Sequence, residues 1–382
     1  MKKLILFSCI LVLEACSTHE EIFTSNVTVN FNVHELSSVL SDESIYSAKL
    51  TGKDHIVGFL NTSFFTFQDS FTSASVVPGS IKTGKVVHED AEQLVVFSTI
   101  SLENGEKNYQ LNDVILSSTG INSAPRFTLY DKKDNLPGKP LNTRGFRTYT
   151  NAFFLSQAKG WIFCQYSGAN SSDYPEGLRT YRINGASIEI ISTIPNRSYV
   201  PVDAYFKNDD IGWLIATNFS IPYTYYFFKT TDGGVTWNLV SADDYKVQVK
   251  RMIFIDDQNF VLFGEEGILR TSNSGETWRA TFFESPDRNH SVSDVTKASD
   301  SNILYASIFE GLRDYNAIHS IHRSTDNGKT WTELDKKTLN GNLSFSDERH
   351  GIAYSFTGLE YTANGGKTWD LILYSFPLTK ID

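Results

Sequence analysis

Pairs of neighbouring carboxylates are the residues of this 382-residue chain whose types and spacing could do chemistry. Two carboxyl groups held at different pKa values can serve as the general acid and the general base that cleave a glycosidic bond. Three pairs lie at matching places, each after a phenylalanine and before an apolar run: Asp209-Asp210, Asp256-Asp257 and Asp347-Glu348. A catalytic pair is needed once in a molecule, whereas a turn is needed in every repeat, so we interpret these pairs as turn-forming residues.

Glu265-Glu266 is the better candidate for a functional site, because this pair occurs once and directly follows an apolar run. A solvated loop is the alternative interpretation. Metal chemistry has less support, since His319 and His322 lie three residues apart in an expected strand and should face opposite sides of it. The sequence also lacks zinc-type spacing of Cys and His. We expect no metal and no cofactor.

The elements that must position these residues are marked by a motif, Ser/Thr-x-Asp/Asn-x-Gly-x-Thr-Trp, that recurs along the chain. Its copies contain Asp232, Gly234 and Trp237; Asn273, Gly275 and Trp278; Asp326, Gly328 and Trp331; and Asn364, Gly366 and Trp369. The Asp or Asn can cap a tight turn, and the Gly can adopt a backbone conformation closed to most residues. The Trp begins the next strand and is expected to fill the gap between neighbouring repeats. We predict a structural role for all of these residues.

The copies follow one another at intervals of 41, 53 and 38 residues, counted between positions 232, 273, 326 and 364. Such intervals are typical of propeller blades. A second pattern precedes the motif, in which an aromatic residue is followed six positions later by an apolar run: Phe154 to Gly160, Phe206 to Gly212, Phe254 to Phe260 and Phe345 to Gly351. We interpret each run as a buried inner strand that ends in a turn.

Together these patterns predict an all-β fold, a single β-propeller. Five blades are recognisable, and the segments from His55 and from Gln93 add two more degenerate ones, so we expect seven four-stranded blades, with six and eight left open. The alternating stretch from Ile22, IFTSNVTVNFNV, could complete the last blade and close the propeller. Residues 285–302 are polar and are expected to form a long surface loop.

The repeated motif resembles the Asp box, also called the BNR repeat, of a family of β-propellers. The segment FGEEGILRTSNSGETW, from Phe263 to Trp278, resembles the repeat of photosystem assembly-factor propellers and related bacterial lipoproteins. The resemblance covers roughly the C-terminal half to 60% of the chain. It implies that the boxes lie on blade hairpins away from the active face, so it supplies no catalytic residue.

Sialidases share the Asp boxes, and their sites combine three arginines that hold the substrate carboxylate, a Tyr/Glu nucleophile pair and an Asp acid. In that family the first arginine lies in an Arg-Ile-Pro motif. This chain has no such motif, and its first arginine is Arg126, within the segment Ala124-Pro125-Arg126-Phe127. Catalytic residues therefore stay unknown. We expect a binding protein rather than an enzyme, and a glycosidase if it is an enzyme.

Residues 1–16, MKKLILFSCILVLEAC, resemble a bacterial lipoprotein signal that ends in a lipobox. The apolar core is too short to span a membrane. We therefore divide the chain into a signal peptide (1–15), a lipid-anchor tether (16–21) and the propeller (22–382), with Cys16 as the lipidation site. An ordinary secretory signal is the alternative. With Cys9 removed and Cys16 acylated, Cys164 lacks a disulfide partner and is expected to be a buried packing thiol.

The formal net charge is −10 and no block of Lys or Arg stands out, so nucleic acid is a poor partner. The sequence predicts an envelope-anchored lipoprotein, in the outer membrane or at the bacterial cell surface, whose propeller binds an envelope protein or a glycan without catalysis. We place the contact surface on loops that follow inner strands, including Gly264 to Gly267 and Phe309 to Arg313. The alternative is a cell-surface glycoside hydrolase of sialidase-like type.

Overall fold

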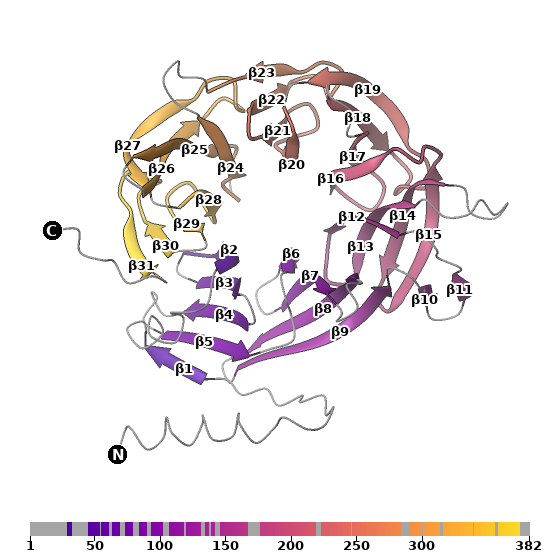
Figure 1. Ribbon diagram of the computed structural model, residues 1–382, viewed down its shortest axis with the longest axis horizontal. Helices are drawn as coiled ribbons and strands as arrows, with labels where there is room; N and C mark the ends of the chain where they lie inside the picture. The colour runs from indigo at the N-terminus through magenta and orange to yellow at the C-terminus, as the bar shows by residue number, and fades with distance from the viewer. Residues whose placement is uncertain are drawn as a thin grey trace.

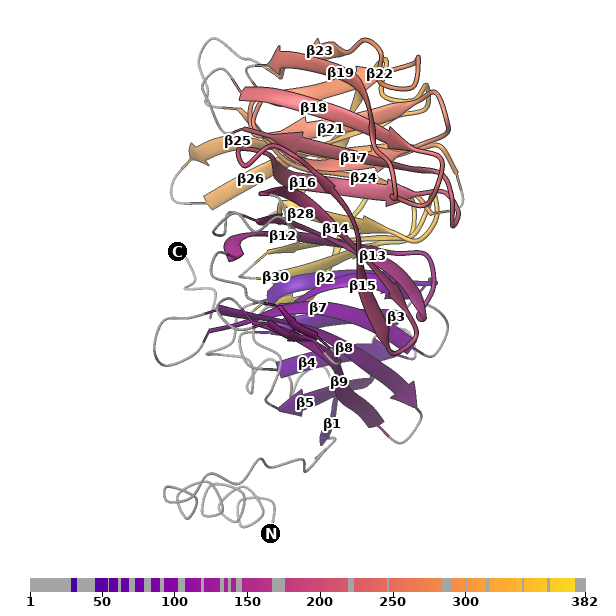
Figure 2. The ribbon, with the colours of Figure 1, turned by 90° about the vertical axis from the view of Figure 1, so that its right-hand side faces the viewer.

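The computed structural model describes residues 29–32 and, with short gaps, residues 45–374. Within these residues every regular element is a β-strand, and the strands form six four-stranded sheets, one five-stranded sheet and one two-stranded ribbon. Figure 1 shows the larger sheets arranged around one axis as blades, and Figure 2 shows the same propeller from its edge. The predicted all-β propeller is confirmed, and seven sheets of four or five strands agree with the expected blade number.

The blades are numbered here in chain order, and the strands within each blade are antiparallel. Blade 1 contains β2 (Ile45–Thr51), β3 (His55–Leu60), β4 (Ser63–Gln68) and β5 (Ser73–Pro78), with β1 (Val29–Asn32) added to β5. Blade 2 contains β6 (Gly84–Glu89), β7 (Gln93–Ser101), β8 (Lys107–Ser117) and β9 (Gly120–Tyr130). Blade 3 contains β12 (Phe146–Phe154), β13 (Lys159–Tyr166), β14 (Gly177–Asn184) and β15 (Ser187–Ile194).

The remaining blades follow the same order, from an innermost first strand to an outermost last strand (Figure 1). Blade 4 contains β16 (Val200–Phe206), β17 (Gly212–Thr217), β18 (Tyr223–Thr230) and β19 (Asn238–Tyr245). Blade 5 contains β20 (Val249–Phe254), β21 (Phe260–Gly264), β22 (Gly267–Thr271) and β23 (Arg279–Thr281). Blade 6 contains β24 (Ser291–Lys297), β25 (Leu304–Arg313), β26 (Asn316–Ser324) and β27 (Thr332–Thr338). Blade 7 contains β28 (Asn342–Phe345), β29 (Gly351–Ser355), β30 (Gly358–Thr362) and β31 (Asp370–Tyr374), and the ribbon contains β10 (Asp134–Leu136) and β11 (Lys139–Leu141). No helix able to cross a membrane is found among the described residues.

Two predictions about segments outside the repeated motif are wrong. Strand β1 pairs with β5 as a fifth strand of blade 1 and does not complete the last blade, because β31 already occupies the outer position of blade 7. Residues 22–28 lie outside the described residues. The polar segment 285–302 is not a loop throughout, since Ser291–Lys297 forms β24, the innermost strand of blade 6; residues 285–289 and 300 lie outside the described residues.

The propeller is closed by side-chain hydrogen bonds between blades 7 and 1. The backbone N–H of Leu50 donates to Ser344 Oγ at 3.1 Å, and the Tyr361 hydroxyl donates to the Lys53 carbonyl at 2.9 Å. In the described part of the chain the first and last blades share no strand, so these hydrogen bonds and the packing of β2 against β28 and β29 close the propeller.

Apolar residues fill the spaces between neighbouring blades. Strand β17 is buried along its whole length, as expected for a strand covered on both faces. One cluster joins blades 4 and 5 through Trp213, Phe227 and Phe260, and another joins blades 3 and 4 through Trp161 and Phe206. The core is therefore a series of interfaces between sheets, and each interface depends on two blades.

A phenylalanine lying on a glycine explains three of the four copies of the second sequence pattern; in the fourth, Phe254 pairs with Phe260. Phe206 and Gly212 are directly paired between β16 and β17, and a Cβ atom on Gly212 would lie 2.6 Å from Phe206 Cδ1. The same pair recurs as Phe154 with Gly160 and as Phe345 with Gly351, where the corresponding distance is 2.5 Å. Gly is required here because the aromatic ring occupies the place of a side chain.

We predict that Gly212→Ala lowers the free energy of unfolding by roughly 1–3 kcal/mol, because the new methyl group overlaps the Phe206 ring. Phe206→Ala should cost about 3–5 kcal/mol through lost packing against Trp161. In the double variant the alanine at 212 should cost little beyond Phe206→Ala, since the clash is gone. Urea unfolding of the four proteins measures this coupling, and strictly additive losses would contradict the proposed contact.

Candidate functional site

The first of the four repeated turns joins β18 and β19 and is built around the Asp232 carboxylate. Thr230 Oγ1 donates to Asp232 Oδ1 at 2.8 Å and accepts the Gly234 N–H at 2.9 Å. Thr236 donates its backbone N–H to Asp232 Oδ1 at 2.8 Å and its hydroxyl to Oδ2 at 2.6 Å. These hydrogen bonds, the hydroxyl of Thr236 foremost, lower the pKa of Asp232 to about 2.

The copies with Asn keep the same geometry by reversing one hydrogen bond. Asn273 Oδ1 accepts the Thr277 N–H at 3.0 Å, as Asp232 does for Thr236. Asn273 Nδ2 then donates to Thr277 Oγ1 at 3.0 Å, so the threonine hydroxyl accepts where it donates in the Asp copy. Asn364 and Thr368 repeat the arrangement with Asn, and Asp326 and Thr330 repeat the one with Asp. The turn therefore needs two polar atoms at this position and no charge.

The four tryptophans lie between their own blade and the preceding one. Trp237 donates its indole N–H to Thr180 Oγ1 of blade 3 at 3.1 Å, and Trp278 contacts Phe227 of blade 4 with ring centroids 5.2 Å apart. Trp331 packs in the cluster between blades 5 and 6, and Trp369 in the cluster between blades 6 and 7. The repeated turns thus connect strands within a blade and also fix one blade to the next.

We predict that Asp232→Asn keeps the free energy of unfolding at pH 7 within about 1 kcal/mol of wild type, whereas Asp232→Ala loses about 1–3 kcal/mol. The folded pKa near 2 lies below the ordinary value of 3.8, so the carboxylate stabilises the fold above pH 3.8 and this contribution disappears as the pH falls toward 2. The advantage of wild type over Asp232→Ala should therefore shrink between pH 4 and pH 2. Urea unfolding at stepped pH tests this, with the Asn variant as the uncharged control.

The recurring carboxylate pairs lie in the turns between the first two strands of their blades, as predicted, but their positions do not match. In blades 5 and 7, the Oδ1 atoms of Asp256 and Asp347 accept the two backbone N–H groups that follow in the turn. In blade 4 this task belongs to Asn208, so Asp209-Asp210 falls one residue later. The three pairs therefore do not occupy equivalent positions. No acid stands at the position of Asp210 in blades 5 and 7.

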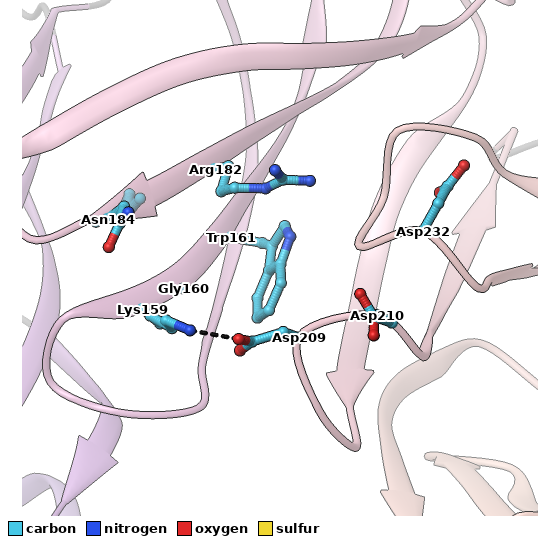
Figure 3. Close-up of a pocket in the computed structure, with 9 residues that line it drawn as sticks. Lys159, Gly160, Trp161, Arg182, Asn184, Asp209, Asp210 and Asp232 are labelled. Atoms are coloured by element: carbon cyan, nitrogen blue, oxygen red, sulfur yellow. Dashed lines mark hydrogen bonds and ion pairs between the residues drawn. The ribbon is translucent and has the colours of Figure 1, made fainter.

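A pocket of about 250 Å³ lies next to Asp210, between blades 3 and 4 (Figure 3). Six of its lining residues are charged or polar: Lys159, Arg182, Asn184, Asp209, Asp210 and Asp232. Trp161 closes one wall, where its indole stacks on Phe206 and donates to the Gly233 carbonyl at 2.9 Å. The pocket lies on the side of the propeller that carries the repeated turns.

Charged residues along the central channel are engaged in linking blades. Asp203 on β16 accepts the Ala204 N–H and the Asn151 amide with Oδ1, and the Met252 N–H of blade 5 with Oδ2. Asp294 on β24 accepts the Val295 N–H and Arg251 Nη2 with Oδ1, and the Leu343 N–H of blade 7 with Oδ2. Burial raises the pKa of Asp294, against the opposing effects of Arg251 and the backbone N–H groups. Sequence reasoning missed both aspartates, because each stands alone at a β-bulge without a recurring neighbour.

The predicted contact loops lie on the other side, at one mouth of the channel. Glu265-Glu266 is the two-residue turn between β21 and β22, where Glu266 Oε2 accepts the Gln248 N–H at 2.8 Å. Glu265 pairs with Lys250 at 2.9 Å. Phe309 to Arg313 is not a loop, since β25 continues through Arg313 and pairs with β26. Blade 6 therefore presents a long hairpin at this mouth (Figure 2).

His319 on β26 packs within blade 6. Its Nδ1 lies 3.2 Å from Ser293 Oγ and 3.3 Å from Ser307 Oγ, and its ring centroid lies 5.5 Å from that of Phe309. The carbonyl of Glu265 accepts the N–H of Val292, the neighbour of Ser293. Burial lowers the pKa of His319 to about 4, so the ring is neutral at neutral pH. No cluster of three or more metal-ligating side chains occurs in the described part of the chain.

Arginines link neighbouring blades at several junctions, and Arg251 and Arg270 both serve the junction between blades 5 and 6. Arg182 Nη2 donates to the Gly233 carbonyl at 3.1 Å, Arg270 Nε donates to the Asn327 carbonyl at 2.9 Å, and Arg323 lies 3.7 Å from Glu348. Arg126 lies in β9.

Cys164 is a buried free thiol, and Cys16 and residues 1–15 lie outside the described residues.

No family model and no curated protein matches this sequence. Among solved structures, a 6-phosphogluconolactonase-like protein of Bacteroides fragilis is similar over 93% of this chain and 96% of its own, with a TM-score of 0.52 and 10% identity. A second such protein, from Bacteroides uniformis, covers 86% of this chain and 95% of its own (TM-score 0.49, 13% identity). The Hadza microbial sialidase Hz136 covers 82% and 72% (TM-score 0.42, 12% identity). At 10% identity the likeness to the Bacteroides fragilis protein shows the fold alone.

Proposed function

We propose that this protein is a non-catalytic binding or assembly module of the bacterial cell envelope, anchored by lipid on Cys16. One observation carries the preference for binding over catalysis. The channel carboxylates Asp203 and Asp294, which a propeller enzyme could use, each accept hydrogen bonds from a neighbouring blade and so serve the assembly of the fold. If either carboxylate gave up these hydrogen bonds to act on a substrate, buried N–H groups of the next blade would lose their acceptor.

The arrangement of the arginines supports the same preference over a sialidase-like glycoside hydrolase. Such an enzyme needs several arginines converging on one substrate carboxylate. Arg182, Arg270 and Arg323 lie at three different blade junctions, and each has its partner in the following blade. They act as structural links, as does Arg251, which donates to Asp294 of blade 6.

The mouth formed by blades 5 and 6 is the surface that we assign to the partner. It combines the exposed carboxylate of Glu265 with two aromatic side chains, Phe282 and Phe309. Phe282 lies beside Gly267 and is 45% exposed. The Val292 N–H of blade 6 donates to the Glu265 carbonyl of blade 5 at 2.8 Å and holds the two blades in a fixed relation here. A partner can therefore make contacts that neither blade supplies by itself.

We predict that crosslinking of tagged full-length protein in its native membranes recovers a stoichiometric partner. The combined variant Glu265→Ala, Phe282→Ala and Phe309→Ala should reduce recovery at least tenfold, because it removes the charged and aromatic contacts at the mouth. Lys207→Ala is the matched control, since this exposed residue lies at a turn on the opposite side and should leave recovery unchanged. Mass spectrometry identifies the partner, and partner recovery that survives the triple variant would overturn the assignment of this surface.

A further inference from the structure

The repeats of this chain show which turn residues the fold requires. In blades 4, 5 and 7 the turn between the first two strands ends with a residue whose carbonyl accepts an N–H from the repeated turn of the same blade. These bonds run from Gly233 to Asp210, from Ser274 to Gln258 and from Gly365 to Arg349, at 2.8, 3.0 and 2.7 Å. The side chain at this position is an acid, an amide or a base, so the turn uses the backbone alone.

The carboxylate of Asp210 is therefore not explained by the fold. The residue before it is explained, because Asp209, Asp257 and Glu348 each form an ion pair with a cation of the preceding blade. Asp210 is exposed, and its side chain has no hydrogen-bond or ion-pair partner among the residues that the structure describes. It stands at the rim of the pocket between blades 3 and 4 (Figure 3).

The pocket offers hydrogen-bond donors and acceptors in nearly equal measure. Lys159, Arg182 and Asn184 carry donors, and Asn184 and the three aspartates carry acceptors. Lys159 and Asp209 also pair with each other, Arg182 donates to the Gly233 carbonyl, and Asp232 accepts hydrogen bonds from its own turn. Three carboxylates disfavour an anionic ligand, and the ammonium and guanidinium groups disfavour a cationic one. Each hydroxyl group of a sugar both donates and accepts, so a neutral polyhydroxyl ligand matches all sides of this pocket.

Size and rigidity restrict the ligand further. A volume of about 250 Å³ is below the range of about 300–1,000 Å³ typical of drug-sized ligands, so one sugar ring fits and a longer glycan extends into solvent. The Trp161 wall is fixed by its hydrogen bond to Gly233 and by its stacking on Phe206. Asp232 is held by its own turn, and its low pKa keeps it an acceptor at all physiological pH values.

We infer that this pocket binds a single neutral sugar residue of a glycan, with the Asp210 carboxylate and the Asn184 amide as the groups that recognise its hydroxyls. The site is separate from the mouth of blades 5 and 6 and does not depend on the partner proposed there. It takes contacts from two blades, as the mouth does, but on the side that carries the repeated turns.

The test is saturation-transfer NMR of the full-length protein with the methyl β-glycosides of glucose, galactose and N-acetylglucosamine, followed by titration. A ligand of this size should bind with a Kd on the order of 1 mM. Asp210→Ala and Asn184→Ala should each weaken binding about tenfold, the loss expected for a hydrogen bond to a charged or well-placed polar group. Gln258→Ala, at the equivalent position of blade 5, is the matched control and should leave binding unchanged.

Three outcomes would overturn the inference: saturation by none of the three glycosides, binding that both pocket variants retain, or stronger saturation of free arginine or of sialyllactose than of the neutral sugars. Asp210→Gln, which installs the blade 5 residue, keeps the turn intact and should still weaken binding. Unfolding curves of all variants establish that the fold is kept. The mouth variant described above should bind the sugars normally, so failure of one proposal is distinguishable from failure of the other.

Discussion

The propeller depends on hydrogen bonds that cross from a side chain of one blade to the backbone of the next. Each sheet is complete in itself, and no backbone ladder joins two blades in the described residues. Cohesion between blades therefore comes from apolar packing, from these side chains and from single backbone bonds such as Val292 N–H to the Glu265 carbonyl. Arg270 and Tyr361 hold equivalent positions, just before the repeated turns, and each reaches a carbonyl of the following blade, Asn327 or Lys53. The same device thus serves an ordinary junction and the closure between blades 7 and 1.

This constraint determines which charged residues remain available for function. A carboxylate buried at the channel is costly unless several donors surround it, and Asp203 and Asp294 each have three. Their oxygens satisfy N–H groups of the innermost strands in neighbouring blades, where backbone pairing cannot do so. Asp203 and Asp294 resemble catalytic acids in their burial and position. They are also the carboxylates on which the fold depends most.

How much the sequence predicts depends on whether a signal is local and repeated. The turns around Asp232 and its copies, and the pairing of Phe206 with Gly212, follow from short patterns that recur in several blades. The location of β1 could not be predicted, because its pairing with β5 joins segments more than 40 residues apart without a shared motif. The role of Asp294 was hidden for a related reason, since its partners Arg251 and Leu343 belong to two other blades.

In a repeat protein, the same turn position can be compared between blades. A residue that differs between blades while the turn keeps its geometry is not required by the fold. Asp or Asn alternates at the repeated turn without changing its geometry, so a charge there is allowed by the fold and not demanded by it. Asp326 keeps the charge in blade 6 as Asp232 does in blade 4, so this position alone identifies no site. The combination is different: in blade 5 the two positions hold Gln258 and Asn273, and in blade 7 they hold Arg349 and Asn364, whereas blade 4 places Asp210 and Asp232 around one pocket. Because both substitutions leave the turn intact elsewhere, the paired carboxylates of blade 4 are best explained by something that the pocket holds.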